Sequence, residues 1–162
     1  MPEEPSPDPA ERLGRALELA YRQLGTRDRT TAEVLAHLGR RGVNEATAAT
    51  AVAELRRQGY LDDARYAQRF AEDRRRLDAW GDERIARRLE AAGVGAADIE
   101  AALGGQDLDE TRAAAVALLR RRVRVAPAND RERERALGLL VRRGYELELA
   151  YDAVRAFEGG AA

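Results

Sequence analysis

The 162-residue sequence lacks cysteine and lysine, so all 28 basic residues are arginines, and histidine and serine occur once each, as His37 and Ser6. Without cysteine the chain has no disulfide, thiol nucleophile or cysteine–histidine zinc site. Without lysine it has neither a Schiff-base nucleophile nor a phosphate-binding P-loop. Ser6 lies in a proline-rich stretch, which argues against a serine–histidine triad. We therefore expect no catalytic residue, cofactor or metal, and a binding protein rather than an enzyme.

The chain is also poor in aromatic residues, at 5%, and in long apolar runs. Alanine, leucine, arginine and glutamate, which are good helix formers, dominate instead. No apolar run approaches the roughly 20 residues that span a bilayer. The acidic, proline-rich residues 1–9 lack the pattern of a secretory signal. We expect an almost entirely helical, cytoplasmic protein with no membrane partner.

The net charge of −1 does not by itself indicate a nucleic-acid-binding protein, because such proteins are more often clearly basic. The arginines are nevertheless clustered, in one run at residues 74–76 and in a second at 120–122 that is followed by Arg124. Each cluster is typical of either a solvated helix face or a binding surface. The sequence alone leaves both interpretations open.

An internal repeat organises the chain. Gly42, Gly93 and Gly144 are spaced 51 residues apart. A leucine stands four residues before each glycine, at Leu38, Leu89 and Leu140. An aliphatic residue stands ten residues after each glycine, at Val52, Leu103 and Val154. Three units in one phase predict a tandem repeat, in which each unit buries its apolar face against itself and its neighbours.

Each unit is predicted to contain three helices. The fold class is therefore all-α, with nine helices in three tandem three-helix repeats that form an elongated helical array. The predicted boundaries are a disordered acidic tail at 1–9, repeats at 10–58, 59–105 and 106–158, and a flexible C-terminus at 159–162. Such an array offers a large surface and little obvious pocket, which favours the binding of a macromolecule.

The ends of the helices are marked by capping residues. Thr30 and Glu33 form the pattern of a capping box, and Gly42 suits the left-handed C-terminal cap of the same helix. Four further N-caps are predicted, at Asn44, Asp62, Asp82 and Asp107. Gly81 is predicted to end the helix that follows Asp62, and Pro127 the helix that follows Asp107. The buried face of the helix after Asp62 is predicted to hold Tyr66, Ala67, Phe70, Ala71 and Leu77.

Three stretches carry a resemblance to a known family. They are residues 24–34, residues 59–67 (Gly-Tyr-Leu-Asp-Asp-Ala-Arg-Tyr-Ala), and residues 81–89, which continue to Gly93. Over about residues 12–158 the sequence resembles the RecX family, regulators of the bacterial RecA recombinase, most strongly in the middle repeat and least in the third. Tyr66 replaces the family's usual phenylalanine. The motif residues, which we expect to be structural, are Leu61, Asp62, Asp63, Tyr66, Ala67, Gly81, Ile85, Leu89 and Gly93.

The resemblance implies a non-enzymatic modulator, usually an inhibitor, that binds RecA in the groove of its filament on single-stranded DNA. Such a protein would lower ATP hydrolysis and strand exchange by RecA, and so regulate recombination, DNA repair and the SOS response. It would have no small-molecule substrate, and we expect a monomer; direct contact with single-stranded DNA stays open. A rod of three units could contact several RecA protomers at once, and multivalent contact raises avidity.

The arginines are the residues that we expect to contact a partner, because guanidinium groups pair with carboxylates and phosphates. Arg65, Arg69 and Arg76 recur at helical spacing and share one helix face. The full predicted contact set is Arg65, Arg69, Arg76, Arg84, Arg87, Arg88, Arg120, Arg121, Arg122 and Arg124.

Three alternatives are weighed against this function. Asp62 and Asp63 could be the carboxylate pair of an acid–base enzyme, but adjacent residues at a helix start do not converge on one substrate, so capping explains them more simply. A helix-turn-helix-like DNA-binding transcription regulator would need a recognition helix with exposed polar residues, whereas the helices predicted at 44–57 and 96–103 are alanine-rich. The third alternative is a helical scaffold for another partner.

Overall fold

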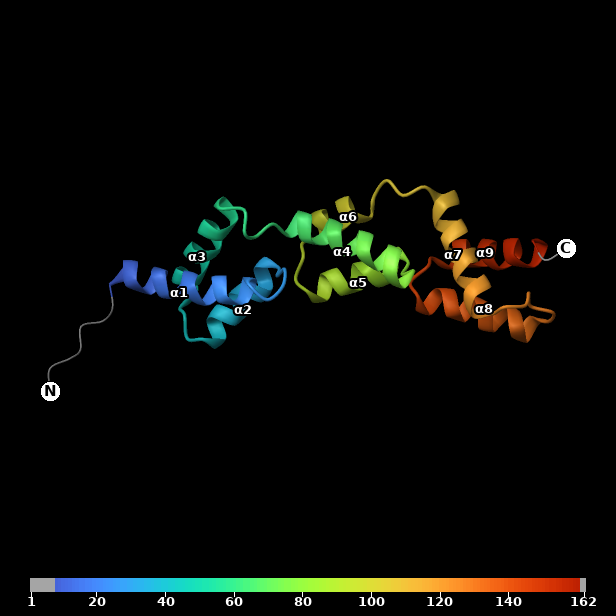
Figure 1. Ribbon diagram of the computed structural model, residues 1–162, viewed down its shortest axis with the longest axis horizontal. Coiled ribbons are helices and arrows are strands. Elements are labelled where there is room, and N and C mark those ends of the chain that lie inside the picture. The colour runs from blue at the N-terminus through green and yellow to red at the C-terminus, as the bar shows by residue number, and fades with distance from the viewer. Residues whose placement is uncertain (1–7, 161–162) are drawn as a thin grey trace. The chain divides into compact units, whose positions relative to one another are not determined.

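The computed structural model of the chain describes residues 8–160, and within this range it consists of nine α-helices and no β-strand (Figure 1). The helices are α1 (Pro9–Leu24), α2 (Thr31–Arg40), α3 (Glu45–Arg57), α4 (Asp63–Asp78), α5 (Asp82–Ala91), α6 (Ala96–Leu103), α7 (Leu108–Arg122), α8 (Asp130–Arg142) and α9 (Leu147–Gly159). The predicted all-α fold with nine helices is confirmed for the described residues. Of the terminal segments predicted at 1–9 and 159–162, residues 1–7 and 161–162 lie outside the described range.

The described chain forms two compact units. The first contains the residues up to Tyr66 together with Ala92–Gly95, and the second contains Ala67–Ala91 and the residues from Ala96 onward. The division falls inside α4 and again at the short loop between α5 and α6. The first unit therefore combines α1, α2 and α3 with a loop from the predicted second repeat. The repeat boundaries at 58 and 105 stay a prediction.

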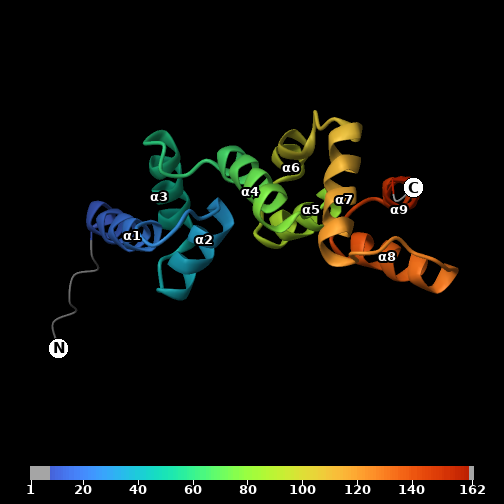
Figure 2. The ribbon, with the colours of Figure 1, turned by 45° about the vertical axis from the view of Figure 1, so that its right-hand side comes forward.

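The first unit is built on α1, α2 and α3, which are coloured blue to teal in Figure 2. Their apolar stripes form one buried cluster: Ala16, Leu19, Ala20, Val34, Leu38, Ala48, Ala51, Val52, Leu55 and Leu61. The predicted capping box of α2 is confirmed, because the Thr30 hydroxyl accepts a hydrogen bond from the Glu33 N–H and the Glu33 carboxylate accepts one from the Thr30 N–H. The predicted N-cap of α3 is confirmed too, since the Asn44 side chain accepts from the Thr47 N–H.

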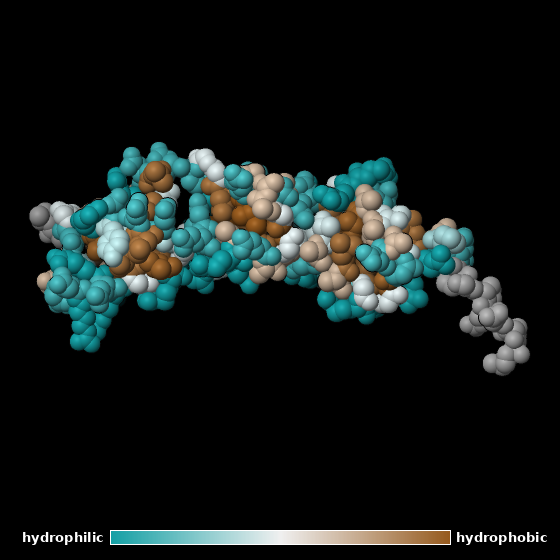
Figure 3. Space-filling model, turned by 180° about the vertical axis from the view of Figure 1, so that it is seen from behind, coloured by the Kyte–Doolittle hydropathy of each residue, from teal (hydrophilic) through white to brown (hydrophobic). Residues whose placement is uncertain are grey.

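The second unit has its largest core among α7, α8 and α9. The buried residues are Ala115, Val116, Leu118, Leu119, Ala136, Leu140, Tyr145, Ala150, Ala153, Val154 and Phe157. α4 and α5 add Ala67, Ala71, Ile85 and Leu89, all fully buried. Burial raises the pKa of Tyr145, which keeps its hydroxyl neutral within this core. Figure 3 shows that the hydrophobic residues left at the surface gather in patches among hydrophilic ones.

The structure corrects the sequence prediction around the end of α4. Leu77 is 62% exposed rather than buried, because it lies in the last turn, beyond the buried Ala71. The helix ends at Asp78, and Ala79 makes the turn with a φ of 51°, so the predicted helix end at Gly81 is wrong. Asp82 is consequently the first residue of α5 rather than its N-cap.

Candidate partner-binding surface

The two adjacent aspartates of the Leu-Asp-Asp motif serve two different helices. Asp62 caps its own helix, because its Oδ1 accepts a hydrogen bond from the Arg65 N–H at 2.9 Å. Asp63 reaches α2, where its Oδ1 accepts from the Thr31 N–H at 2.8 Å. Each carboxylate thus satisfies an N–H at a helix N-terminus, where negative charge is also favoured by the helix dipole. The two side chains do not converge on a common substrate site.

The loop that follows α5 lies on the first turn of α2. Thr30 is fully buried there, and its hydroxyl donates a hydrogen bond to the Ala92 carbonyl at 2.6 Å. Gly93 has a φ of 79°, and a Cβ at this position would lie 2.3 Å from the Ala32 Cβ. Glycine is therefore required both for the left-handed backbone and for the close approach of loop and helix.

The loop that follows α8 makes the corresponding contact with α5 in the second unit. The Gly81 N–H donates to the Arg143 carbonyl at 2.8 Å, and the Glu83 N–H donates to the Gly144 carbonyl at 3.1 Å. A Cβ on Gly81 would lie 2.3 Å from the Gly144 oxygen. The role of Gly81 is therefore to let two backbones meet, which the sequence alone does not indicate.

The arginines predicted on one face of α4 are partly engaged within the protein. The Arg65 guanidinium donates to the Gly59 carbonyl at 2.8 Å, and Arg76 pairs with Asp73 at 3.2 Å. Arg65 lies in the first unit, whereas Arg69 and Arg76 lie in the second. The three residues therefore belong to different compact parts of the chain.

Arg84, Arg74 and Arg75 have interaction partners within the second unit. The Arg84 guanidinium lies over the Trp80 ring, 4.2 Å from its centroid, and that of Arg74 lies 5.7 Å from the same centroid. These distances are typical of cation–π contacts. Arg75 pairs with Asp82 across the turn between α4 and α5, at 2.8 Å. The sequence leaves open whether the cluster at residues 74–76 is a solvated helix face or a binding surface. In the structure Arg74 and Arg75 already contact partners within the protein.

Six of the predicted arginines are exposed and form no ion pair or side-chain hydrogen bond with any residue in the described range. These unpaired arginines are Arg87, Arg88, Arg120, Arg121, Arg122 and Arg124. The first two lie on α5, residues 120–122 are the last three of α7, and Arg124 lies just beyond that helix. Since α7 ends at Arg122, the predicted helix end at Pro127 is wrong. A signal for the α7 group exists in the sequence, because no acidic residue lies within four positions of residues 120–122. Their guanidinium groups are available for carboxylates or phosphates.

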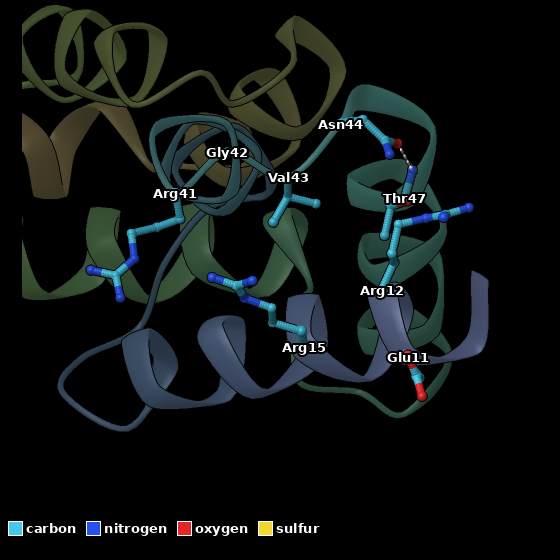
Figure 4. A pocket seen from close by; sticks show the side chains of 8 residues that line it. All are labelled: Glu11, Arg12, Arg15, Arg41, Gly42, Val43, Asn44 and Thr47. Atoms are coloured by element: carbon cyan, nitrogen blue, oxygen red, sulfur yellow. Dashed lines mark hydrogen bonds between the residues drawn. The ribbon is translucent and has the colours of Figure 1, made fainter. Parts of the chain in front are cut away.

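A basic cavity in the first unit was not predicted from the sequence. Its volume is about 510 Å³, and its lining (Figure 4) is Glu11, Arg12, Arg15, Arg41, Gly42, Val43, Asn44 and Thr47. Arg15 of α1 extends toward the α2–α3 loop that carries Arg41. Burial, together with the charges of Arg40 and Arg41, lowers the pKa of His37 on α2. The C-terminal end of α2 is therefore electropositive.

The described residues lack two other kinds of feature. Within residues 8–160, no group of three or more histidine or acidic side chains is arranged to hold a metal ion. No helix in this part of the chain combines the length and the apolar character that crossing a bilayer requires. The described residues do offer a set of unpaired arginines and a basic cavity.

Comparison with protein families matches two parts of the chain. Residues 16–55 match the family model described as RecX, first three-helix domain, and residues 62–103 match RecX, second three-helix domain. The chain is 35% identical over 163 residues to the regulatory protein RecX of Mycolicibacterium vanbaalenii, covering 92% of this chain and 89% of that protein. It is 34% identical over 156 residues to the regulatory protein RecX of Mycobacterium tuberculosis H37Rv, covering 93% and 90%.

Two solved structures share the fold. The crystal structure of RecX from Lactobacillus salivarius matches with a TM-score of 0.83 at 17% identity, covering 92% of this chain and 98% of that chain. A crystal structure of regulatory protein RecX matches with a TM-score of 0.77 at 22% identity, covering 91% and 73%. At these identities the likeness concerns the fold alone.

Proposed function

As the chain belongs to the RecX family of non-enzymatic regulatory proteins, we propose that it binds the RecA filament on single-stranded DNA and inhibits it. In this role it acts in the cytoplasm, lowers ATP hydrolysis by RecA and so regulates recombination, DNA repair and the SOS response. Support comes from the Leu-Asp-Asp and Gly-x-x-Arg-Ile motifs in the middle of the chain and from relatives that are similar over nearly their whole length.

The observation that carries the proposed contact surface is the set of unpaired arginines. An unpaired guanidinium keeps all five N–H donors and its full charge for another group, whereas a paired one has part of each already engaged. Three of the six lie in succession in the last turn of α7, where positive charge also interacts favourably with the helix dipole, and Arg124 follows just beyond the helix. This end of α7 is therefore the part of the surface that we expect to meet acidic groups of the filament.

The proposal is tested by titrating the protein into RecA that hydrolyses ATP on single-stranded DNA. The wild-type chain is expected to reduce the rate, and no effect at saturation would contradict the proposed function. The triple variant Arg120→Glu, Arg121→Glu, Arg122→Glu is expected to lose inhibition while its circular dichroism spectrum stays helical. Normal inhibition by this variant would contradict the α7 surface and leave the function standing.

A matched control separates the loss of particular contacts from a general change of charge. Arg57, Arg112 and Arg155 are exposed, and each pairs with an acidic residue three positions away. Their triple substitution by glutamate changes the net charge by the same amount and should leave inhibition close to that of the wild type.

Fluorescence anisotropy with labelled DNA and no RecA then reports whether the chain contacts DNA itself. Sequence-preferring binding to duplex DNA would favour a transcription regulator instead.

A further inference from the structure

The two junction loops show one contact used twice within the chain. In each, the loop after the second helix of a predicted repeat lies on the first turn of another second helix. On α5 the carbonyls of Arg143 and Gly144 accept the hydrogen bonds, and on α2 the accepting carbonyl is that of Ala92. Ala92 and Arg143 are 51 residues apart, so the contact recurs in the register of the repeat.

The α2–α3 loop has the same shape and no such partner within the described chain. Gly42 has a φ of 79°, like Gly93, but a Cβ placed on it would meet no atom within 4 Å. The carbonyls of Arg41 and Gly42, which occupy the accepting positions, receive no hydrogen bond from residues 8–160. The basic cavity lies beside this loop, with Arg15 on its wall. The first loop of the series is thus open and has basic residues beside it.

The first turn of α8 is the other open end of the series. This helix begins three residues earlier in its repeat than α2 and α5 do, so its cap Asn129 stands 48 residues after Gly81. Asn129 caps this helix through its Oδ1, which accepts from the Glu132 N–H at 3.0 Å, as Thr30 caps α2. The backbone N–H groups of Asn129 and Arg131 find no acceptor among the described residues. The Asn129 amide N–H₂ offers a donor where the Thr30 hydroxyl offers one on α2. Asp130, whose side chain is 93% exposed, carries a negative charge on this turn and pairs with Arg133 at 2.8 Å.

We propose that the α2–α3 loop of one copy docks on the first turn of α8 in a second copy. The contact repeats the internal one: carbonyls of Arg41 and Gly42 meet donors at Asn129 and Arg131, and Arg15 and Arg41 lie opposite Asp130. The helix dipoles match, because the C-terminal end of α2 meets the N-terminal end of α8, and Asp130 supplies a carboxylate opposite the basic loop. The contact is head-to-tail and uses different surfaces on the two copies, so it can extend from copy to copy. The monomer expected from the sequence is then the state at low concentration.

Disulfide cross-linking tests the contact cleanly, because the chain contains no cysteine. Full-length Arg41→Cys and Arg131→Cys variants are mixed and equilibrated in a glutathione redox buffer. The cross-linked heterodimer is expected to form several-fold more than in a control mixture of Arg41→Cys and Arg112→Cys, where Arg112 is the exposed fifth residue of α7. Equal yields in the two mixtures would overturn the proposal. Circular dichroism shows whether each variant is folded.

A charge exchange adds a second, independent readout. Adding Arg15→Glu to the Arg41→Cys copy should lower the yield of the 41–131 cross-link, because glutamate then lies opposite Asp130. Adding Asp130→Arg to the other copy should restore the yield. A yield that Arg15→Glu does not change, or that Asp130→Arg does not restore, would show that these surfaces do not face each other and would overturn the proposed geometry.

Discussion

The two junction loops make the same contact with different chemistry. On α2 the donor is the side-chain hydroxyl of Thr30, so a buried side chain lies between the loop and the helix backbone. On α5 the donor at the corresponding position is the backbone N–H of Gly81, so the loop lies directly on backbone. The 51-residue repeat sets where each contact forms. The residue at the donor position decides how closely the two backbones approach.

This difference implies unequal tolerance of added atoms. A Cβ on Gly93 would meet one neighbour closely, the Ala32 methyl group, at 2.3 Å. A Cβ on Gly144 would meet both the Cβ and the backbone nitrogen of Arg84 at 2.4 Å. Backbone inside a helix can shift only if the whole helix moves. A methyl group that collides with the backbone of α5 is therefore expected to cost more stability than one that collides with the Ala32 side chain on α2.

Substitution Gly144→Ala is expected to have the largest effect, about 4 kcal/mol of lost stability. Gly144 and Gly42 both have positive φ, at 91° and 79°, so alanine costs roughly 1–2 kcal/mol in backbone strain at either position. Only at Gly144 does the added methyl group also collide with Arg84. Urea unfolding followed by circular dichroism should therefore show Gly144→Ala less stable than Gly42→Ala by about 2 kcal/mol. Equal losses would contradict the contact between this loop and α5.

Substitution Gly81→Ala comes next, with an expected loss of about 3 kcal/mol. The φ of Gly81 is not positive, so the loss comes from the 2.3 Å approach of the new Cβ to the Gly144 oxygen. Gly14→Ala is the control, because Gly14 lies inside α1 and a Cβ there meets nothing within 4 Å. That variant should gain about 0.5–1 kcal/mol from better helix propensity. A neutral Gly81→Ala variant in the same unfolding assay would rule out backbone contact at this junction.

The local features of the fold could be predicted from the sequence, because capping acts over three or four residues. Thr30, Asn44 and Asp62 cap the helices that the sequence assigns to them. The equal spacing of Gly42, Gly93 and Gly144 corresponds to left-handed turns after α2, α5 and α8. Contacts between distant segments could not be predicted in this way. Nothing near Asp63 indicates that its carboxylate accepts from an N–H 32 residues earlier.

The candidate site was predictable in part for the same reason. Arg65 and Arg76 each follow an aspartate by three residues, which predicts the ion pairs that the structure contains. Residues 120–122 have no acidic neighbour, which predicts that their charges are unpaired. The basic cavity depends on the approach of α1 to the α2–α3 loop, so Arg15 and Arg41 share no local pattern that would reveal it.

Substitution Thr30→Val is expected to cost about 2 kcal/mol, less than Gly81→Ala. Valine keeps the shape of threonine but removes the hydroxyl, so the Glu33 N–H loses its cap and the Ala92 carbonyl loses its donor. Thr30→Ser keeps both hydrogen bonds and should lose clearly less. The measurement is again urea unfolding. Similar losses for the two variants would show that the methyl group of Thr30, rather than its hydroxyl, holds the junction.

The smallest expected effect is the pH dependence that Glu33 contributes to the α2 junction. Burial raises the pKa of Glu33, but hydrogen bonds from Arg27 and from the Thr30 N–H outweigh it, and the net pKa lies below the ordinary value of 4.5. Between these two values the unfolded chain binds more protons than the folded one, so stability falls as pH falls. The contribution of Glu33 is complete above pH 4.5 and is lost as pH drops through its folded pKa. Urea unfolding from pH 6 to pH 3 should therefore show a shallower loss for Glu33→Gln than for the wild type, and parallel curves would show that this carboxylate is not stabilised in the folded state.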